Sequence, residues 1–235
     1  MDLSRFQSAV KSDARSYDLG LRDFMIGVYN NMFIGIAITA IVALLVSSSA
    51  SLMQLIHATP LKYVIMFAPF GMVMFFSFKI NSAAYSTLKG VFYGYAALMG
   101  AMLSYIFIVY TGASIVRTLF ITASMFGAMS LWGYTTKKDL TSMGSFLFMG
   151  LIGIVIMSLV NLFMKSSAIH FMVSFLAIII FVGLTAYETQ SLKATYQRYG
   201  NSESTKRVGL MGALNLYMSF LNIFIHLLQF IGDRK

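Results

Sequence analysis

A stripe of polar side chains in the apolar segment 208–231 is the first candidate for chemistry in this sequence. Five polar residues recur there at steps of four, three, four and three: Asn215, Ser219, Asn222, His226 and Gln229. This is helical spacing, so all five lie on one face of a helix long enough to cross a bilayer, which takes about 20 residues. Hydrocarbon offers such groups no hydrogen-bond partner, so the stripe must face protein or a wet cavity. Two interpretations stay open: the side chains hold neighbouring helices together, or the helix lines a polar pathway.

Glu188 is the second candidate. Only four acidic residues follow residue 23, and three of them, Asp139, Glu203 and Asp233, lie in expected loops or in the tail. Glu188 follows an apolar segment directly, so we expect it half-buried at the cytoplasmic mouth of a membrane span. An ionisable group at membrane depth is a functional candidate, because a charge in hydrocarbon is costly. The alternative is a helix-end carboxylate that reaches out to the lipid headgroups.

Other chemistry finds little support in the sequence. It has no HExxH, GxSxG or P-loop pattern, and its three histidines lie far apart. There is no cysteine, so disulfides and thiolate sites are excluded. No basic patch with interleaved aromatic residues suggests nucleic acid. We predict a protein that is not an enzyme and that has no cofactor and no nucleic-acid partner.

The composition defines the elements that must position these residues. Hydrophobic residues make up 58% of the 235 and charged ones 11%, which indicates an integral membrane protein embedded in the lipid bilayer. We predict an all-α fold: a cytoplasmic N-terminal tail over 1–23, partly helical, and one transmembrane domain over 24–235. Gly90 and Gly94 predict a close helix approach in the third span. The seven predicted spans are approximately 24–46, 61–78, 90–110, 114–134, 143–164, 168–187 and 208–231.

Basic residues predict the orientation of these spans, because Lys and Arg gather on the cytoplasmic side. With seven spans, the N-terminus and the even-numbered loops share one side, and most of the 17 Lys and Arg residues fall there. The opposite side holds only Lys62, Arg117, Lys165, Arg234 and Lys235. The count therefore predicts a cytoplasmic N-terminus and an external C-terminus.

Three segments stand out together: WGYTTKKDL at 132–140, GLTAYETQSLK at 183–193 and ALNLYMSFLNIFIHLLQFIGDRK at 213–235. They resemble the Bax inhibitor-1 (TMBIM) family, in its bacterial YccA/YetJ-like branch. The resemblance implies six helices in two three-helix layers around a central seventh helix, in a bacterial inner membrane. Family members are linked to a proton-sensitive calcium leak, and the eukaryotic ones to suppression of cell death. Some bacterial relatives bind and restrain a membrane-bound ATP-dependent protease.

The family's pH sensor is a pair of aspartates, and this sequence departs from it. The matching positions are Glu188, in YET, and Ser219, in LYMSF. Two close carboxylates share a proton, and a single carboxylate lacks this coupling. Calcium takes six to eight oxygen ligands, so Glu188 with Ser219, Asn215 and Asn222 predicts a weak, transient calcium site. The resemblance also implies a basic latch, and Lys79 is placed to pair with Glu188 or to anchor in the headgroups.

Two functions follow as hypotheses. The first is a pH-sensitive calcium or cation leak lined by the seventh helix, with Glu188, Ser219, Asn215, Asn222 and His226 along the pathway. The second is a regulatory protein that does not transport ions but modulates a membrane-bound ATP-dependent protease or a stress response. The loss of the second carboxylate at Ser219 favours the second hypothesis.

Overall fold

The structure is a computed structural model that describes the backbone of residues 3–235 and the side chains from Asp18 onward. Apart from an isolated bridge between Tyr110 and Arg234, the described residues form helices and their connections. The helices are α1 (Leu3–Ser47), α2 (Ala50–Ala58), α3 (Leu61–Lys79), α4 (Tyr85–Leu103), α5 (Ile106–Val109), α6 (Gly112–Thr135), α7 (Thr141–Met164), α8 (Ser167–Tyr199) and α9 (Glu203–Ile231).

Seven of these helices are long and apolar enough to cross a membrane, which confirms the predicted all-α, seven-span class. They are the stretch Asp18–Ser47 of α1, the stretch Tyr85–Val109 that includes α4 and α5, and α3, α6, α7, α8 and α9. Each helix pairs its backbone N–H and C=O groups within its own segment, as the hydrocarbon interior of a bilayer requires.

Two helices extend beyond the predicted spans. The backbone of α1 is helical from Leu3 onward, so residues 3–23 continue the helix of the first span instead of forming a separate segment. The sixth span was expected to end at residue 187, but α8 continues to Tyr199. The polar segment after Glu188 contains no glycine or proline until Gly200, where a positive φ of 61° ends the helix.

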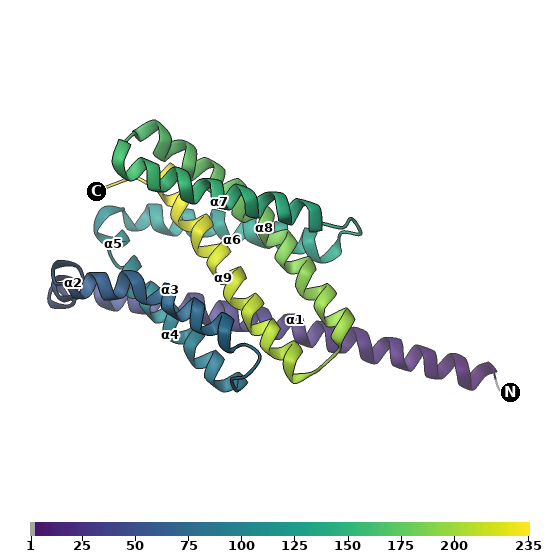
Figure 1. Ribbon diagram of the computed structural model, residues 1–235. Helices are drawn as coiled ribbons and strands as arrows, with labels where there is room; N and C mark the ends of the chain where they lie inside the picture. The colour runs from purple at the N-terminus through teal and green to yellow at the C-terminus, as the bar shows by residue number, and fades with distance from the viewer. Residues whose placement is uncertain (1–2) are drawn as a thin grey trace.

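The helix α9 lies at the centre of the bundle. It passes between a group made of α1, α3 and α4 and a group made of α6, α7 and α8 (Figure 1). In its most apolar stretch 67% of the residues are buried, against 11% for α7 and 17% for α3. It packs mainly against α1, α4, α6 and α8, whereas α3 packs on α4 and α7 on α8. The predicted arrangement of six helices around the seventh is thus only partly present, because α3 and α7 lie on the outside.

The bundle has two ends, which we call the Gly200 end, where α8 meets α9, and the Gly232 end, where α9 stops. At the Gly200 end Arg207 donates to the Asn81 carbonyl in the α3–α4 connection, at 2.9 Å. At the Gly232 end Lys235 donates through Nζ to the Phe107 carbonyl, at 2.7 Å. These contacts hold one end of α9 at the α3–α4 connection and its other end at α5.

Candidate functional site

Glu188 and Ser219, which come from separate sequence motifs, meet between α8 and α9. The Ser219 hydroxyl donates to Glu188 Oε2 at 3.1 Å. Ser219 is 2% exposed and Glu188 is partly buried. Glu188 lies about three helical turns before the end of α8, and Ser219 is near the middle of α9. The carboxylate therefore lies inside the bundle, at the level of the middle of α9.

Glu188 has no cationic partner among the described residues. The ion pairs in that part of the chain join Arg117 to Asp233 and Lys206 to Glu203. The predicted latch between Lys79 and Glu188 is absent from this structure, which corrects that expectation. Lys79 is exposed at the end of α3, and α3 packs against α2 and α4 instead of α8.

The polar stripe of α9 faces α8 at three of its five positions. Besides Ser219, His226 Nδ1 lies 3.5 Å from the Ser174 hydroxyl, which donates to Gln229 Oε1 at 3.1 Å. Asn222 instead donates to the Met218 carbonyl of its own helix, at 2.8 Å. Among the described residues Asn215 makes no hydrogen bond, and its side chain is partly buried. Ser219, His226 and Gln229 thus form a line of polar groups along the α8–α9 interface. Within the described part of the chain, Asn215 and Asn222 have no hydrogen bond to α8.

A cluster of hydroxyl groups that includes Thr189, the residue after Glu188, was not predicted from the sequence. Tyr29 of α1 is hydrogen-bonded to Ser130 of α6, and Ser130 is hydrogen-bonded to Thr189 of α8 at 3.1 Å. Thr189 follows Glu188 directly in the chain and is fully buried. Three helices thus bring these hydroxyls together one residue along α8 from Glu188, and we call this set the hydroxyl cluster.

The sequence carries a signal for this cluster. Ser114, Thr118, Thr122 and Ser130 recur in α6 at multiples of four residues, and all four are buried. This is the same helical periodicity that identified the stripe in α9. Hydroxyl groups are weaker markers than amides or imidazole, because Ser and Thr can bond to the carbonyl four residues back in their own helix. Thr122 does so, to Thr118, at 2.9 Å.

The opposite face of α9 is fixed by Tyr217. Its hydroxyl lies 2.6 Å from Thr39 Oγ1, and Thr39 donates to the Ala96 carbonyl at 2.8 Å. The ring of Tyr217 is fully buried and packs edge-on against Phe92 and Tyr95 of α4. Because Tyr217 is only two residues from Ser219, these contacts with α1 and α4 set the position of the Ser219 hydroxyl.

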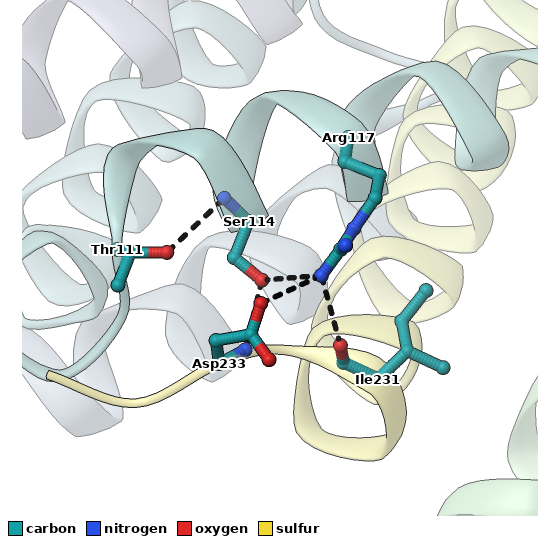
Figure 2. A network of polar contacts seen from close by, with 5 residues as sticks. All are labelled: Thr111, Ser114, Arg117, Ile231 and Asp233. Atoms are coloured by element: carbon teal, nitrogen blue, oxygen red, sulfur yellow. Dashed lines mark hydrogen bonds and ion pairs between the residues drawn. The ribbon is translucent and has the colours of Figure 1, made fainter.

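The chain end beyond α9 is held at the start of α6 (Figure 2). Arg117 Nη2 lies 2.8 Å from Asp233 Oδ2 and 3.5 Å from the Ile231 carbonyl. The Asp233 backbone N–H donates to the Ser114 hydroxyl at 2.9 Å. Both charged side chains are more than half exposed, so the ion pair itself adds little stability. The backbone bond to buried Ser114 is the stronger constraint on the Gly232 end of α9.

The connection between α6 and α7 is fixed to α8 two residues beyond Glu188. Gln190 Oε1 accepts from the Leu140 N–H and its Nε2 donates to the Lys138 carbonyl, both at 2.8 Å. Asp139 accepts from the Thr141 N–H at 2.9 Å, at the start of α7. Hydrogen bonds from the Thr141 side chain and backbone lower the pKa of Asp139, since they stabilise its charged form.

Ligands for a tightly held metal are not gathered in one place. Among the described residues no three His, Asp or Glu side chains come together in a way that could hold a metal ion. At the Glu188 carboxylate the structure places the hydroxyl oxygen of Ser219. Such a site offers oxygen ligands but a single negative charge.

A seven-span all-α bundle with a polar central helix and an interior carboxylate defines an integral membrane protein. Comparison with known proteins identifies its family. The family profile described as "Inhibitor of apoptosis-promoting Bax1" matches residues 21–235. The chain therefore belongs to the Bax inhibitor-1 family, as the three sequence segments predicted.

Curated relatives cover almost the whole chain. An uncharacterized protein of Rickettsia prowazekii is 44% identical, over 95% of this chain and 95% of its own length. The inner membrane protein YbhL of Escherichia coli K12 is 42% identical, over 92% of this chain and 94% of its own length. An uncharacterized protein of Caulobacter vibrioides is 40% identical, over 94% and 92% respectively.

Proposed function

We propose that this protein is a pH-sensitive leak pathway for calcium or a similar cation, lined by α9. The observation that carries the proposal is the Ser219–Glu188 hydrogen bond inside the bundle, with no cation paired to the carboxylate among the described residues. An ionised carboxylate within a span attracts a cation, and such groups mark ion pathways in membrane proteins. The line of polar groups toward His226 and Gln229 extends the pathway along α9.

A single carboxylate suits transient passage better than tight binding. Calcium sites tune their affinity by the number of charged ligands and by rigidity. Glu188 supplies one charge, while Ser219 supplies a neutral oxygen. A cation held this weakly can leave again, which conduction requires.

The pH dependence of the leak follows from the same residue. Ionised Glu188 attracts a cation, and protonation removes its charge. Without the Lys79 latch, protonation has no ion pair to release. We expect calcium influx into dye-loaded proteoliposomes to fall as the pH is lowered. Liposomes that contain the purified protein but conduct no faster than empty ones at any pH would overturn the proposal.

A second candidate is a regulator that does not transport ions, and one observation favours it. Ser219 stands where the family has a second carboxylate, so the charge available to a cation is halved. This function predicts co-purification with a membrane-bound ATP-dependent protease and a change in its proteolysis rate when the chain is deleted. Unchanged proteolysis together with measurable calcium flux would exclude it.

The orientation we propose is a cytoplasmic Gly200 end in a bacterial inner membrane, with the N-terminus inside and the C-terminus outside. Two observations support it: the predominance of basic residues at that end and the inner membrane location of the relative YbhL. Reporter fusions at Asn201 and after Lys235 should report opposite sides of the membrane. Two cytoplasmic signals would contradict a membrane-spanning α9.

Restoring a carboxylate at position 219 should strengthen calcium binding. Because Ser219 Oγ and Glu188 Oε2 are 3.1 Å apart, Ser219→Asp adds both charge and ligand oxygens to the same site. We expect calcium affinity to rise on the order of tenfold and the pH profile of flux to shift. Ser219→Asn is the matched control, with similar size and no charge. Equal affinities in the two variants would show that the site does not bind the ion.

A further inference from the structure

A groove on the lipid-facing side of the bundle lies between α1 and α6. Its volume is about 500 Å³, and its walls come from both helices, including Met25, Phe33 and Leu131, with Phe220 of α9 at its floor. Close packing between α1 and α6 is absent from the part of the chain that the structure describes, whereas each packs on α9. We call this feature the α1–α6 groove.

The groove opens toward the surrounding hydrocarbon. Phe33 is 56% exposed and Leu131 65% exposed at its rim, while Met25 and Phe220 are buried at its base. Both walls belong to membrane-spanning helices. Its lining is almost entirely apolar, so an acyl chain matches it better than water does.

The two ends of the groove have different chemistry. Arg22 lies at one end, near the start of the first span, and its side chain is exposed. The other end, at Phe33 and Ala123, is apolar, and Tyr29 and Ser130 of the hydroxyl cluster lie between the two ends. The axial rise from Arg22 to Phe33 along α1 is roughly 16 Å. One leaflet of a bilayer has about 15 Å of hydrocarbon, so the groove has the length of a single acyl chain.

Arg22, the charged residue at the rim of the groove, determines which lipid headgroup fits there. No Asp or Glu lines the groove, and Asp23 lines a separate pocket with Lys206. A guanidinium binds a phosphate through two parallel hydrogen bonds. We propose that the α1–α6 groove binds one acyl chain of an anionic phospholipid from the leaflet at the Gly200 end, with the lipid phosphate on Arg22. The chain then passes Tyr29 and Ser130 midway along the groove and ends near Phe33.

Gly127 allows the groove to be filled without disturbing the protein. A Cβ atom there would meet no other atom within 4 Å, so the ring of Gly127→Phe occupies the space of the lipid chain. Gly153 in α7 is equally open and lies outside the groove, so Gly153→Phe is the matched control. Arg22→Gln tests the headgroup contact separately, since it leaves the apolar walls intact.

Native mass spectrometry of the full chain in detergent, with added phosphatidylglycerol or phosphatidylcholine, tests the proposal. We expect retained phosphatidylglycerol to fall roughly fivefold or more in Gly127→Phe and to stay at the parental level in Gly153→Phe. Arg22→Gln should lose the preference for phosphatidylglycerol over phosphatidylcholine. Equal retention in Gly127→Phe and the parent, or no headgroup preference in the parent, would overturn the proposal.

A second measurement identifies the occupant in cells. Leu131 at the rim is replaced by the photo-crosslinking residue p-benzoylphenylalanine, and the irradiated protein is analysed by intact mass. A phospholipid adduct supports the proposal. A crosslink to another polypeptide, or an adduct with the mass of a free fatty acid, would contradict the assignment to a phospholipid.

Discussion

Replacing Glu188 by glutamine should lower calcium flux in proteoliposomes about tenfold or more at neutral pH and remove most of its pH dependence. A tenfold change in rate corresponds to about 1.4 kcal/mol, a modest value for the loss of a charge that attracts a cation in the membrane interior. Among the described residues, Asp139 lies in the α6–α7 connection, Glu203 at the start of α9 and Asp233 beyond α9. Asp18 and Asp23 lie within α1, at the start of its membrane-spanning stretch, and both are exposed. None of these carboxylates shares the Ser219 contact of Glu188.

The absence of the Lys79 latch makes this experiment decisive. With a latch, Glu188→Gln would both loosen the helices and remove the charge, and the two effects on flux would oppose each other. Because Lys79 is exposed and unpaired with Glu188, only the loss of charge remains. Glutamine keeps the size of the side chain and can accept the hydrogen bond from Ser219.

Ser219→Ala is the control for the hydrogen bond itself. It keeps the charge of Glu188 and removes the hydroxyl that lies 3.1 Å from it. We expect Ser219→Ala to change flux much less than Glu188→Gln does. Parental flux and an unchanged pH profile in Glu188→Gln would refute the proposed pathway, provided that both proteins are inserted into the liposomes at equal levels.

Gly133→Ala should destabilise the protein strongly, because it separates α6 from α8. A Cβ atom on Gly133 would lie 2.8 Å from the Ala186 Cα and carbonyl carbon, well inside van der Waals contact. Backbone atoms cannot rotate away as a side chain can, so one helix has to move. Overpacking of this kind costs typically 1–3 kcal/mol, and we expect a value of about 3 kcal/mol here.

Gly127→Ala, on the same helix, is the matched control. Its Cβ meets open space, so the better helix propensity of alanine should stabilise it by up to about 1 kcal/mol. The melting temperatures of the two variants should differ by roughly 8–16 °C in a thermal unfolding assay of the detergent-solubilised protein. Equal melting temperatures would show that the Gly133–Ala186 approach is not a tight contact.

The Gly133 contact also bears on the candidate site. Ala186 is two residues before Glu188, and Thr189 of the same helix bonds to Ser130 of α6 at 3.1 Å. A displacement of α8 from α6 therefore alters the hydroxyl cluster. We expect Gly133→Ala to change calcium flux as well as stability, whereas Gly127→Ala should leave flux unaltered.

Membrane insertion and helix class could be predicted from the residues alone. A spanning helix needs only enough consecutive apolar residues and satisfies its backbone within one segment, so both properties are local. The polar face of α9 could also be predicted. Asn215, Ser219 and Asn222 are spaced so that they share one face of a helix, whatever that face contacts. Helix ends were harder to predict, since α8 continues through polar residues to Gly200.

Which helices contact one another depended on packing between segments that are distant in the sequence. Gly90 and Gly94 have the spacing of a close helix contact, yet Gly90 faces open space, whereas Gly133 touches Ala186. Lys79 is at the predicted end of its helix, but the rotation and neighbours of α3 turn it away from α8.

The Ser219–Glu188 contact depends both on the sequence of each helix and on how the two helices pack. Position along a helix is set by the chain, so the depth of each residue in the bilayer follows from the sequence to within a few residues. The direction in which a side chain points is set by how each helix rotates against its neighbours. That rotation results from the summed packing of side chains from four helices around α9, and no single segment of the sequence contains it.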